Sequence, residues 1–323
     1  MTEILAYGAK HRDDNIRAHS SSGGVFPVLA AFVLENGGAV CGAAYGADFS
    51  VEHQIIEKSD DIIKLQGAKY AQSRTEHLFP QLRSILEADR SLLFVGTPCQ
   101  TAGLKAYLRK DYPNLLLVDM ICHGVPSPKA WETYLEHRSQ ADANGSPVSY
   151  VNQRDKSTGW SNYRYSLRID YQNGNAYSTP QGNDMYLLGF VNNLYLRPSC
   201  SQCSFKGASR CSDFTLGDYW GVWDQHPQFD DNMGVSLVLV NTEKARGYWD
   251  RIQDRLRAFP VDPQAALALN TSACHSSIPH KNRESFFARL DSSDFPGLVS
   301  ELLFGTQKKP SLLRRLLRKL LKR

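Results

Sequence analysis

Two continuous apolar runs constrain the fold more than any other feature of this chain. Residues 92–96 read Leu-Leu-Phe-Val-Gly, and residues 115–118 read Leu-Leu-Leu-Val. Such runs are typical of strands in a parallel sheet that helices cover on both faces. Residues 100–109, between the two runs, show helical spacing. We therefore expect an α/β protein with a largely parallel sheet flanked by helices.

The rest of the chain adds helices and a β-rich portion. Residues 163–171 and 175–179 flank Asn173-Gly174, a strong signal for a hairpin in a mixed, β-rich C-terminal portion. Ser22 is the expected N-cap of a helix at residues 25–35. Residues 62–73 read as a loop or short strand. Further helices are predicted at 79–88, 128–138, 185–195 and 245–256, and further strands at 39–45 and 236–240.

Composition and charge exclude several classes of protein. The 323 residues are 42% hydrophobic and 22% charged, which is ordinary for a soluble globular protein. The first residues lack an apolar core of signal-peptide length, and the longest apolar stretch is too short to span a bilayer, so we expect a cytoplasmic location. The net charge is +4, but eight positive charges fall after residue 307. Residues 1–307 therefore carry −4, which argues against nucleic acid as a partner.

Four cysteines in two settings carry the chemistry. Cys99 and Cys122 each follow an apolar run, at the carboxyl ends of strands where such sheets bind ligands. Cys200 and Cys203 form a Cys-x-x-Cys pair in a polar loop, a spacing that lets two thiolates reach one metal. These four thiols predict one soft metal centre, with an iron–sulfur cluster as the leading interpretation.

Other interpretations of the cysteines stay open at this point. Cys200, Cys203 and Cys211 could bind zinc together with His226. A thioredoxin-like thiol pair is a weaker interpretation, because the Cys-x-x-Cys does not open a helix after a strand. We interpret Cys41 and Cys274 as small buried hydrophobic residues.

Two more segments carry candidate site residues. Ser20-Ser21-Ser22-Gly23-Gly24 leads into a helix, where backbone N–H groups can approach a phosphate, although plain helix capping is the more common role of such a run. Lys69 and Gln72 could supply a cation and an amide to a ligand; otherwise they lie in a solvated loop. Asp218 precedes two aromatic residues, and its carboxylate could contact a ligand or stabilise a turn.

Six motifs, in order, resemble the coenzyme F420 hydrogenase/dehydrogenase beta-subunit family. The resemblance runs from about Ser20 to about Phe287. The motifs are Ser21-Ser22-Gly23-Gly24, the stretch Gly-Ala-Lys-Tyr-Ala-Gln-Ser at 67–73, Val-Gly-Thr-Pro-Cys-Gln at 95–100, Cys122-His123-Gly124, Cys200-Ser-Gln-Cys203, and Asp-Phe-Thr-Leu-Gly-Asp-Tyr-Trp-Gly at 213–221.

The resemblance implies a flavin- and iron–sulfur-dependent oxidoreductase that transfers electrons. It implies a [4Fe–4S] cluster and a flavin, with FAD placed before FMN, and it points to the stand-alone bacterial members associated with polysaccharide biosynthesis. His123 and Asp218 are the catalytic candidates. The implied cluster ligands are Cys99, Cys122, Cys200 and Cys203, and the candidate flavin-site residues are Ser21, Ser22, Gly23, Gly24, Lys69, Gln72, Ser73 and Thr97.

The resemblance also divides the chain and leaves its partners open. Residues 1–82 are expected to form an N-terminal flavin-site segment, residues 83–290 the oxidoreductase domain, and residues 291–323 a tail. The electron partner could be F420, a nicotinamide or ferredoxin. The rival hypothesis is a zinc-stabilised, non-redox accessory protein of polysaccharide assembly at the membrane surface.

The last residues predict a basic amphipathic helix. From residue 312 onward, leucines recur in pairs every four residues and arginines and lysines fill the positions between them, with Ser311 as a natural N-cap. This pattern suits the surface of an anionic membrane, and it also suits a partner-binding helix or a disordered end. We expect the tail to place the protein at the inner face of the membrane.

Overall fold

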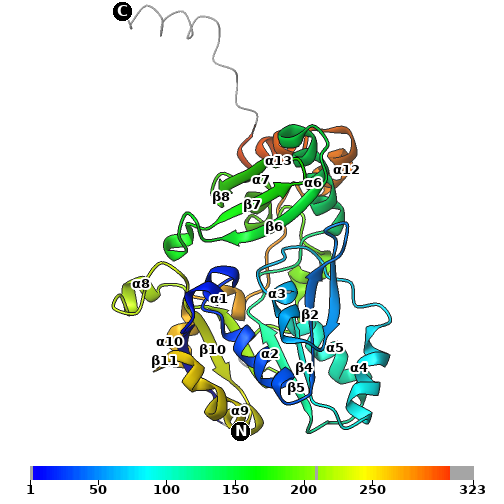
Figure 1. Ribbon diagram of the computed structural model, residues 1–323. Helices are drawn as coiled ribbons and strands as arrows, with labels where there is room; N and C mark the ends of the chain where they lie inside the picture. The colour runs from blue at the N-terminus through cyan, green and yellow to red at the C-terminus, as the bar shows by residue number, and fades with distance from the viewer. Residues whose placement is uncertain (1–2, 208–209, 306–323) are drawn as a thin grey trace, which may run out of the picture.

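A mixed eight-stranded sheet forms the centre of the molecule (Figure 1). The computed structural model describes residues 3–207 and 210–305. The strand order is β11-β1-β10-β9-β5-β4-β2-β3. The pairs β2–β4, β4–β5 and β5–β9 are parallel, and the outer pairs are antiparallel. The strands are β1 (Leu5–His11), β2 (Ala39–Tyr45), β3 (Val51–Ile56), β4 (Leu92–Gly96), β5 (Leu115–Met120), β9 (Phe214–Asp218), β10 (Ser236–Val240) and β11 (Leu256–Val261).

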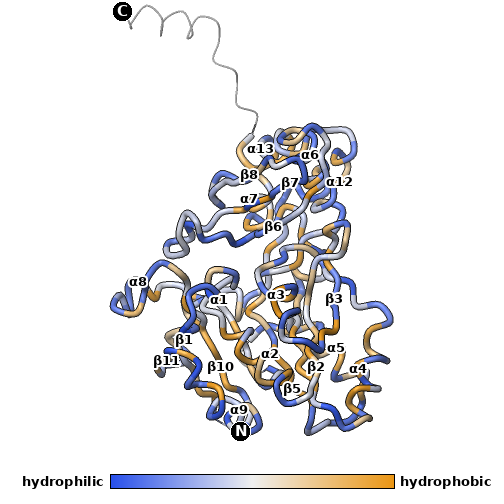
Figure 2. Tube along the Cα trace, in the orientation of Figure 1, coloured by the Kyte–Doolittle hydropathy of each residue, from blue (hydrophilic) through white to orange (hydrophobic). Residues whose placement is uncertain are grey.

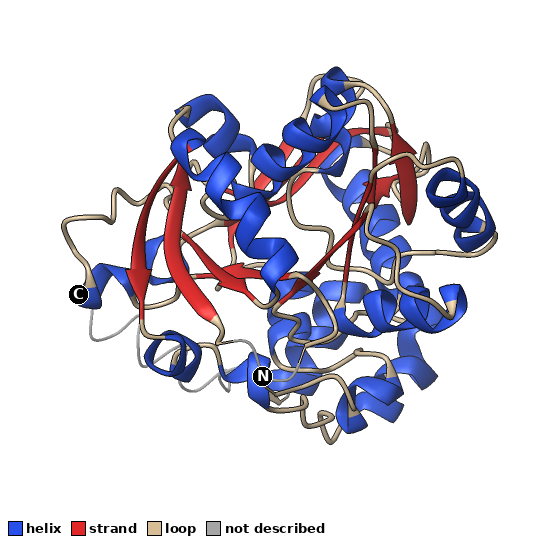
Figure 3. Cartoon of the chain, turned by 90° about the horizontal axis from the view of Figure 1, so that it is seen from below, coloured by secondary structure: helices blue, strands red, loops and turns tan. Residues whose placement is uncertain are grey.

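Helices cover both faces of this sheet, as Figure 3 shows from below. On one face, α2 (Val25–Glu35) and α9 (Glu243–Ile252) bury their apolar sides against β2, β10 and β5. On the other face, α4 (Leu78–Glu87) and α5 (Pro98–Leu108) pack on β4 and β5. The apolar colour of the central strands in Figure 2 follows from this double cover. The predicted α/β class and the parallel centre of the sheet are confirmed.

A smaller antiparallel sheet with its own helices lies above the large one in Figure 1. It contains β6 (Val148–Asp155), β7 (Ser166–Tyr171) and β8 (Ala176–Pro180), and the expected hairpin pairs β7 with β8 across Asn173-Gly174. Four helices pack on it, and aromatic side chains such as Trp131, Tyr134 and Tyr186 fill the space between them. The helices are α6 (Pro128–Ala143), α7 (Met185–Val191), α12 (Arg283–Arg289) and α13 (Phe295–Phe304).

Short elements account for most differences from the sequence-based expectation. The helix α3 occupies part of the stretch expected to be a loop or strand, and Gly24, not Ser22, is the N-cap of α2, with φ of +83°. The predicted helix 185–195 ends at Val191. The short helices are α1 (Asp14–His19), α3 (Ile62–Leu65), α8 (Val222–Gln225), α10 (Pro263–Ala268), α11 (Thr271–Cys274) and 3₁₀ turns at Ser59–Asp61, Ser161–Tyr163, Pro198–Gln202, Gln253–Arg255 and Leu290–Ser292.

Segments from both parts of the expected division contribute strands to the large sheet. Strands from residues 5–56 and strands from residues 92–261 belong to the same sheet, and β1 lies between β10 and β11. Within residues 3–207 and 210–305, every helix is too short or too polar to cross a membrane. The predicted basic amphipathic helix after Pro310 lies outside the described residues.

Candidate functional site

The parallel strands β4 and β5 end at the same edge of the sheet, and a cysteine follows each of them. Cys99 is the second residue of α5, and its thiol lies 3.1 Å from Thr97 Oγ1. The Thr97 and Gln100 side chains form a capping box at the start of this helix, which fixes the turn that carries Cys99. Cys122 follows β5 by two residues. The local sequence therefore brings both thiols to the carboxyl edge of the sheet.

The Cys-x-x-Cys loop is joined to the segment that follows Cys122. The Arg197 N–H donates to the Val125 carbonyl at 2.8 Å, and the Val125 N–H donates to Cys200 Sγ at 3.4 Å. Lys206, three residues after Cys203, donates from Nζ to the Cys122 carbonyl. These contacts hold the loop next to Cys122, although about eighty residues separate them in sequence.

The four thiols lie close enough to influence one another. Burial is the largest cause that raises the pKa of the Cys122 thiol to about 12, and Lys206 opposes the rise. The other three thiols, Cys200, Cys99 and Cys203, each raise the pKa of Cys122 further through their charge. The structure thus gathers the four predicted ligands around Cys122.

Cys211 is not among the groups that shift the pKa of Cys122, although it contacts α5, the helix that carries Cys99. Its thiol has Thr101 Oγ1 as neighbour at 3.8 Å. Cys41 is fully buried in β2, as expected, whereas Cys274 is exposed, which contradicts its interpretation as a small buried hydrophobic residue; it sits at the end of the short helix α11, where little packs over it.

The conformation does not by itself form a finished metal site. In the part of the chain that the structure describes, no three His, Cys, Asp or Glu side chains are arranged to hold a metal ion. His226, which the zinc interpretation needs, packs on Tyr219 and on Phe259 of β11. The sheet order places β11 four strands away from β5, so His226 is not among the cysteines.

The donor chemistry nevertheless fits an iron–sulfur cluster. Four thiols from three chain segments lie near enough for three of them to shift the pKa of the fourth, Cys122, and iron–sulfur clusters are held by four cysteine thiolates. Lys206 brings a positive charge next to Cys122, and the Val125 N–H lies at Cys200 Sγ. Charge and hydrogen bonds of this kind stabilise thiolates and tune cluster potentials. Lys206 was not predicted as a site residue, although it follows the Cys-x-x-Cys by only three residues.

The run Ser21-Ser22-Gly23-Gly24 packs against β10 and the loop before it. Ser22 Oγ donates to the Val235 carbonyl at 2.8 Å, and the Gly23 N–H donates to Ser236 Oγ at 3.0 Å. A Cβ on Gly23 would lie 2.2 Å from the Ala9 carbonyl oxygen, so only glycine fits there. The Ser21 carbonyl accepts from Trp160 Nε1 at 3.2 Å.

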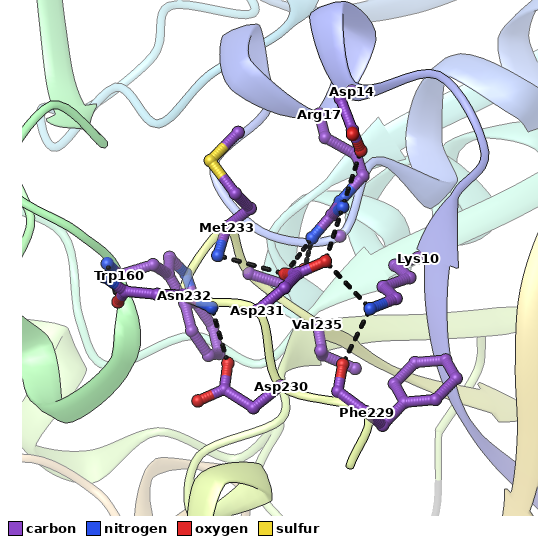
Figure 4. A network of polar contacts seen from close by, with 12 residues as sticks. Lys10, Asp14, Arg17, Trp160, Phe229, Asp230, Asp231, Asn232, Met233 and Val235 are labelled. Atoms are coloured by element: carbon purple, nitrogen blue, oxygen red, sulfur yellow. Dashed lines mark hydrogen bonds and ion pairs between the residues drawn. The ribbon is translucent and has the colours of Figure 1, made fainter. Parts of the chain in front are cut away.

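An ionic network ties this turn to residues 229–235 (Figure 4). Asp231 accepts from Arg17 Nη1 at 2.9 Å and from Lys10 Nζ at 2.9 Å. Lys156, just after β6, donates to the carbonyls of Ser22 and Met233 at 2.7 and 2.8 Å. Lys156 therefore holds the turn through the Ser22 carbonyl, while Lys10 and Arg17 hold the neighbouring segment through Asp231.

The segment 66–73, which contains the other residues predicted for a flavin site, lies next to this turn. Gln66 Nε2 donates to Ser20 Oγ at 3.1 Å, which joins the two segments. Lys69 Nζ donates to the Gln66 carbonyl at 2.7 Å, and burial lowers the pKa of Lys69 to about 7. Ser73 Oγ lies 2.6 Å from His53 Nδ1, and His53 Nε2 lies 3.1 Å from the carbonyl of Val95 in β4.

A cavity of about 470 Å³ opens beside Gln72 and the cysteine loop. Arg197, Arg283 and Phe287 are among its lining residues, and Arg283 stacks over the Phe287 ring at 4.7 Å. Gln72 itself bonds through its N–H to the Pro126 carbonyl at 3.0 Å. The structure therefore places Ser73 and Thr97 at the end of β4 and Gln72 at the cavity.

The two catalytic candidates lie in different surroundings. His123 Nε2 lies 2.6 Å from Asn193 Oδ1, and burial lowers the pKa of His123. It is next to Cys122 and half-buried. Asp218, at the end of β9, accepts two hydrogen bonds from Arg154 at 3.0 and 3.3 Å. Arg154 comes from β6, so this ion pair joins the two sheets.

Two sequence profiles of one family match most of the chain. The first, described as coenzyme F420 hydrogenase/dehydrogenase, beta subunit N-term, matches residues 6–79, and the second, which describes the C terminus of the same beta subunit, matches residues 89–263. The chain belongs to this family. The resemblance inferred from six sequence motifs is thereby confirmed. Members of the family are subunits of oxidoreductases, so the chain has a redox-related role.

A solved structure shares the fold. It is a chain in the F420-reducing [NiFe] hydrogenase complex from Methanosarcina barkeri, with a TM-score of 0.52 and 19% sequence identity. The match covers 89% of the present chain and 92% of the other. A search of curated proteins returned no match.

Proposed function

We propose that this member of the coenzyme F420 hydrogenase/dehydrogenase beta-subunit family is an electron-transferring oxidoreductase with one [4Fe–4S] cluster and one flavin, FAD. The observation that supports the cluster most strongly is the gathering of Cys99, Cys200 and Cys203 around Cys122. These four thiolates would hold the cluster. When bound, the flavin supplies hydride chemistry and the cluster relays single electrons.

The protein's own residues would prepare both sites. Lys206 and the Val125 N–H offset negative charge at Cys122 and Cys200. The 20–24 turn and residues 69–73 would line the flavin site, because Gln66 joins them at the carboxyl edge of the sheet. His123, next to Cys122, would hold or move a proton, with Asn193 Oδ1 setting the orientation of its ring.

Asp218, the second catalytic candidate, also has a structural partner. Its carboxylate is paired with Arg154, whose side chain is only 3% exposed. Arg154 donates to both carboxylate oxygens of Asp218 and comes from β6, so we propose that Asp218 positions the small sheet relative to the large one.

Anaerobic purification tests the cluster and the flavin directly. We expect brown protein with about four iron and about four sulfide per chain, the composition of a [4Fe–4S] centre, and a flavin absorption spectrum. Colourless protein that contains one zinc would support the zinc-stabilised accessory protein and refute the redox proposal. F420, a nicotinamide and ferredoxin are then added separately. The electron partner is the one that bleaches or restores the absorption spectrum.

Substitution of single cysteines tests the ligand set. Cys203→Ser should remove the iron and the visible absorption, because serine is a poor ligand for a soft metal centre. Cys274→Ser is the matched control, since it alters an exposed thiol in the adjoining segment. Equal iron loss in both variants, or none in Cys203→Ser, would show that the ligands are wrong.

We also propose that the basic tail binds the anionic inner surface of the membrane and places the enzyme near polysaccharide biosynthesis. The support is the sequence pattern alone, since residues 306–323 lie outside the described residues. A chain that lacks residues 310–323 should no longer sediment with anionic vesicles, while neutral vesicles should bind neither form. Unchanged sedimentation of the shortened chain would contradict this role.

A further inference from the structure

Two segments beside the cysteines form a surface that is basic and partly apolar. We define the cysteine-side surface as residues 197–207 and 275–283. The segments are joined by hydrogen bonds: the Cys203 N–H donates to Ser276 Oγ at 3.1 Å, and Arg283 Nε donates to the Leu196 carbonyl at 2.9 Å. The surface therefore contains the cysteine loop together with the segment that is hydrogen-bonded to it.

This surface has the opposite charge to the rest of residues 1–307. It contains Arg197, Lys206, Lys281 and Arg283 and no Asp or Glu, whereas residues 1–307 as a whole carry −4. The nearest acid along the sequence is Glu284, which lines the adjoining cavity with Arg197 and Arg283. An acidic partner is thus attracted to this face and repelled by the remainder of the body.

Two apolar side chains stand among these charges. Ile278 is 81% exposed and Phe205 is 39% exposed, both high values for large apolar residues. Asn193 Nδ2 donates to the Ile278 carbonyl at 2.9 Å, so the backbone that presents this side chain is held in place. Exposed large apolar side chains and arginines on one surface are common in protein–protein contacts.

We propose that the cysteine-side surface docks a small acidic electron-carrier protein whose own redox centre lies near its surface. The positive charge of the surface favours an acidic partner. The surface contains Cys203 and contacts Cys122 through Lys206, which favours a partner with a redox centre. The patch is small, which suits the weak and transient encounters of electron-transfer proteins. The inference rests on the proposed function in one respect, because a redox partner is useful only if the cysteines hold a cluster.

Binding of an acidic ferredoxin, in its oxidised form, to the full-length protein tests the proposal. We expect binding by isothermal calorimetry at low ionic strength that disappears as the salt rises from about 0.01 to about 1 M, because the Debye length falls from about 30 to about 3 Å. The double variant Arg197→Glu/Lys281→Glu should weaken the binding at least tenfold. Both side chains are exposed, so the variant should fold.

The matched control is Lys58→Glu/Arg257→Glu. Both residues are exposed; Lys58 follows β3 at the end of the sheet opposite the cysteines, and Arg257 lies on the edge strand β11. The dissociation constant of this control for ferredoxin should lie within about twofold of that of the unaltered protein. This corresponds to a difference of about 0.4 kcal/mol in binding free energy.

The proposal is overturned if ferredoxin fails to bind, if both double variants bind alike, or if calcium-free calmodulin, an acidic protein without a redox centre, binds as tightly. Iron content is measured on the same samples. Protein without iron that still binds ferredoxin refutes the cluster but not the docking surface, whereas iron-loaded protein that does not bind refutes only the docking surface.

Discussion

Replacement of Asp231 by asparagine should destabilise the protein, because it removes the negative charge at the centre of the network in Figure 4. Asp231 accepts hydrogen bonds from Arg17 and Lys10, whose side chains are 2% and 8% exposed. Asparagine keeps the shape of the side chain and loses the charge. The two buried cations are then left with Asp14 as the acidic partner of Arg17, and Asp14 is 76% exposed.

The magnitude follows from the pKa of Asp231. Burial raises this pKa, but the hydrogen bonds and charges of Arg17 and Lys10 outweigh burial and hold it at about 2. Relative to an unfolded value of about 3.9, the shift corresponds to about 2.6 kcal/mol. The carboxylate is 38% exposed, so solvent screening reduces this to about half. Lys10 and Arg17, which are buried, also lose the carboxylate that offsets their charge, and this adds to the loss. We expect a total loss of about 1 to 3 kcal/mol in the free energy of unfolding.

Urea unfolding as a function of pH measures this loss. The folded-state pKa lies below the unfolded one, so the stabilisation is present above about pH 4 and disappears as the pH falls through about 2. Asp231→Asn should therefore be less stable than the unaltered protein at neutral pH, and the difference should shrink in acid. Asp14→Asn is the control and should cost less than about 0.5 kcal/mol. Equal effects of the two variants, or a difference that grows in acid, would refute the reasoning.

Two other substitutions test the packing around the site. Arg154→Leu should cost about 3 to 5 kcal/mol in urea unfolding, because it leaves Asp218 without its partner; adding Asp218→Asn should recover part of the loss, and strict additivity would contradict the ion pair. Gly23→Ala should cost more than about 1 kcal/mol, because its Cβ would meet the Ala9 carbonyl oxygen at 2.2 Å. Gly247 lies in α9, and a Cβ added there would have nothing within 4 Å. Gly247→Ala should therefore stabilise the protein by about 1 kcal/mol. A Gly23→Ala variant more stable than Gly247→Ala would contradict this packing.

Regular elements with a strong local pattern were predicted from the sequence nearly to the residue. The helix at 25–35 and the strands at 39–45 and 236–240 have the bounds that were expected. The hairpin around Asn173-Gly174 also formed as expected. These patterns depend on periodicity and turn chemistry within a few residues, which a sequence displays directly.

The site was only partly visible in the sequence. The spacing of Cys200 and Cys203 and the strand-end positions of Cys99 and Cys122 pointed to one centre, and the structure gathers these thiols. The ion pair between Asp218 and Arg154 was not visible, because the two residues are 64 positions apart in the chain and lie on different sheets. Nothing in a single sequence connects two such residues.

By itself, the sequence determined the class of fold, the family and the thiols that could share a metal, since each follows from short motifs and local spacing. The tertiary structure decided that β1 lies between β10 and β11, that Ser22 and Gly23 pack on β10 and the loop before it, and that Cys203 is joined to Ser276. These features depend on contacts between residues far apart in the chain. Long-range pairing leaves no periodic mark in the sequence, so only the folded chain displays it.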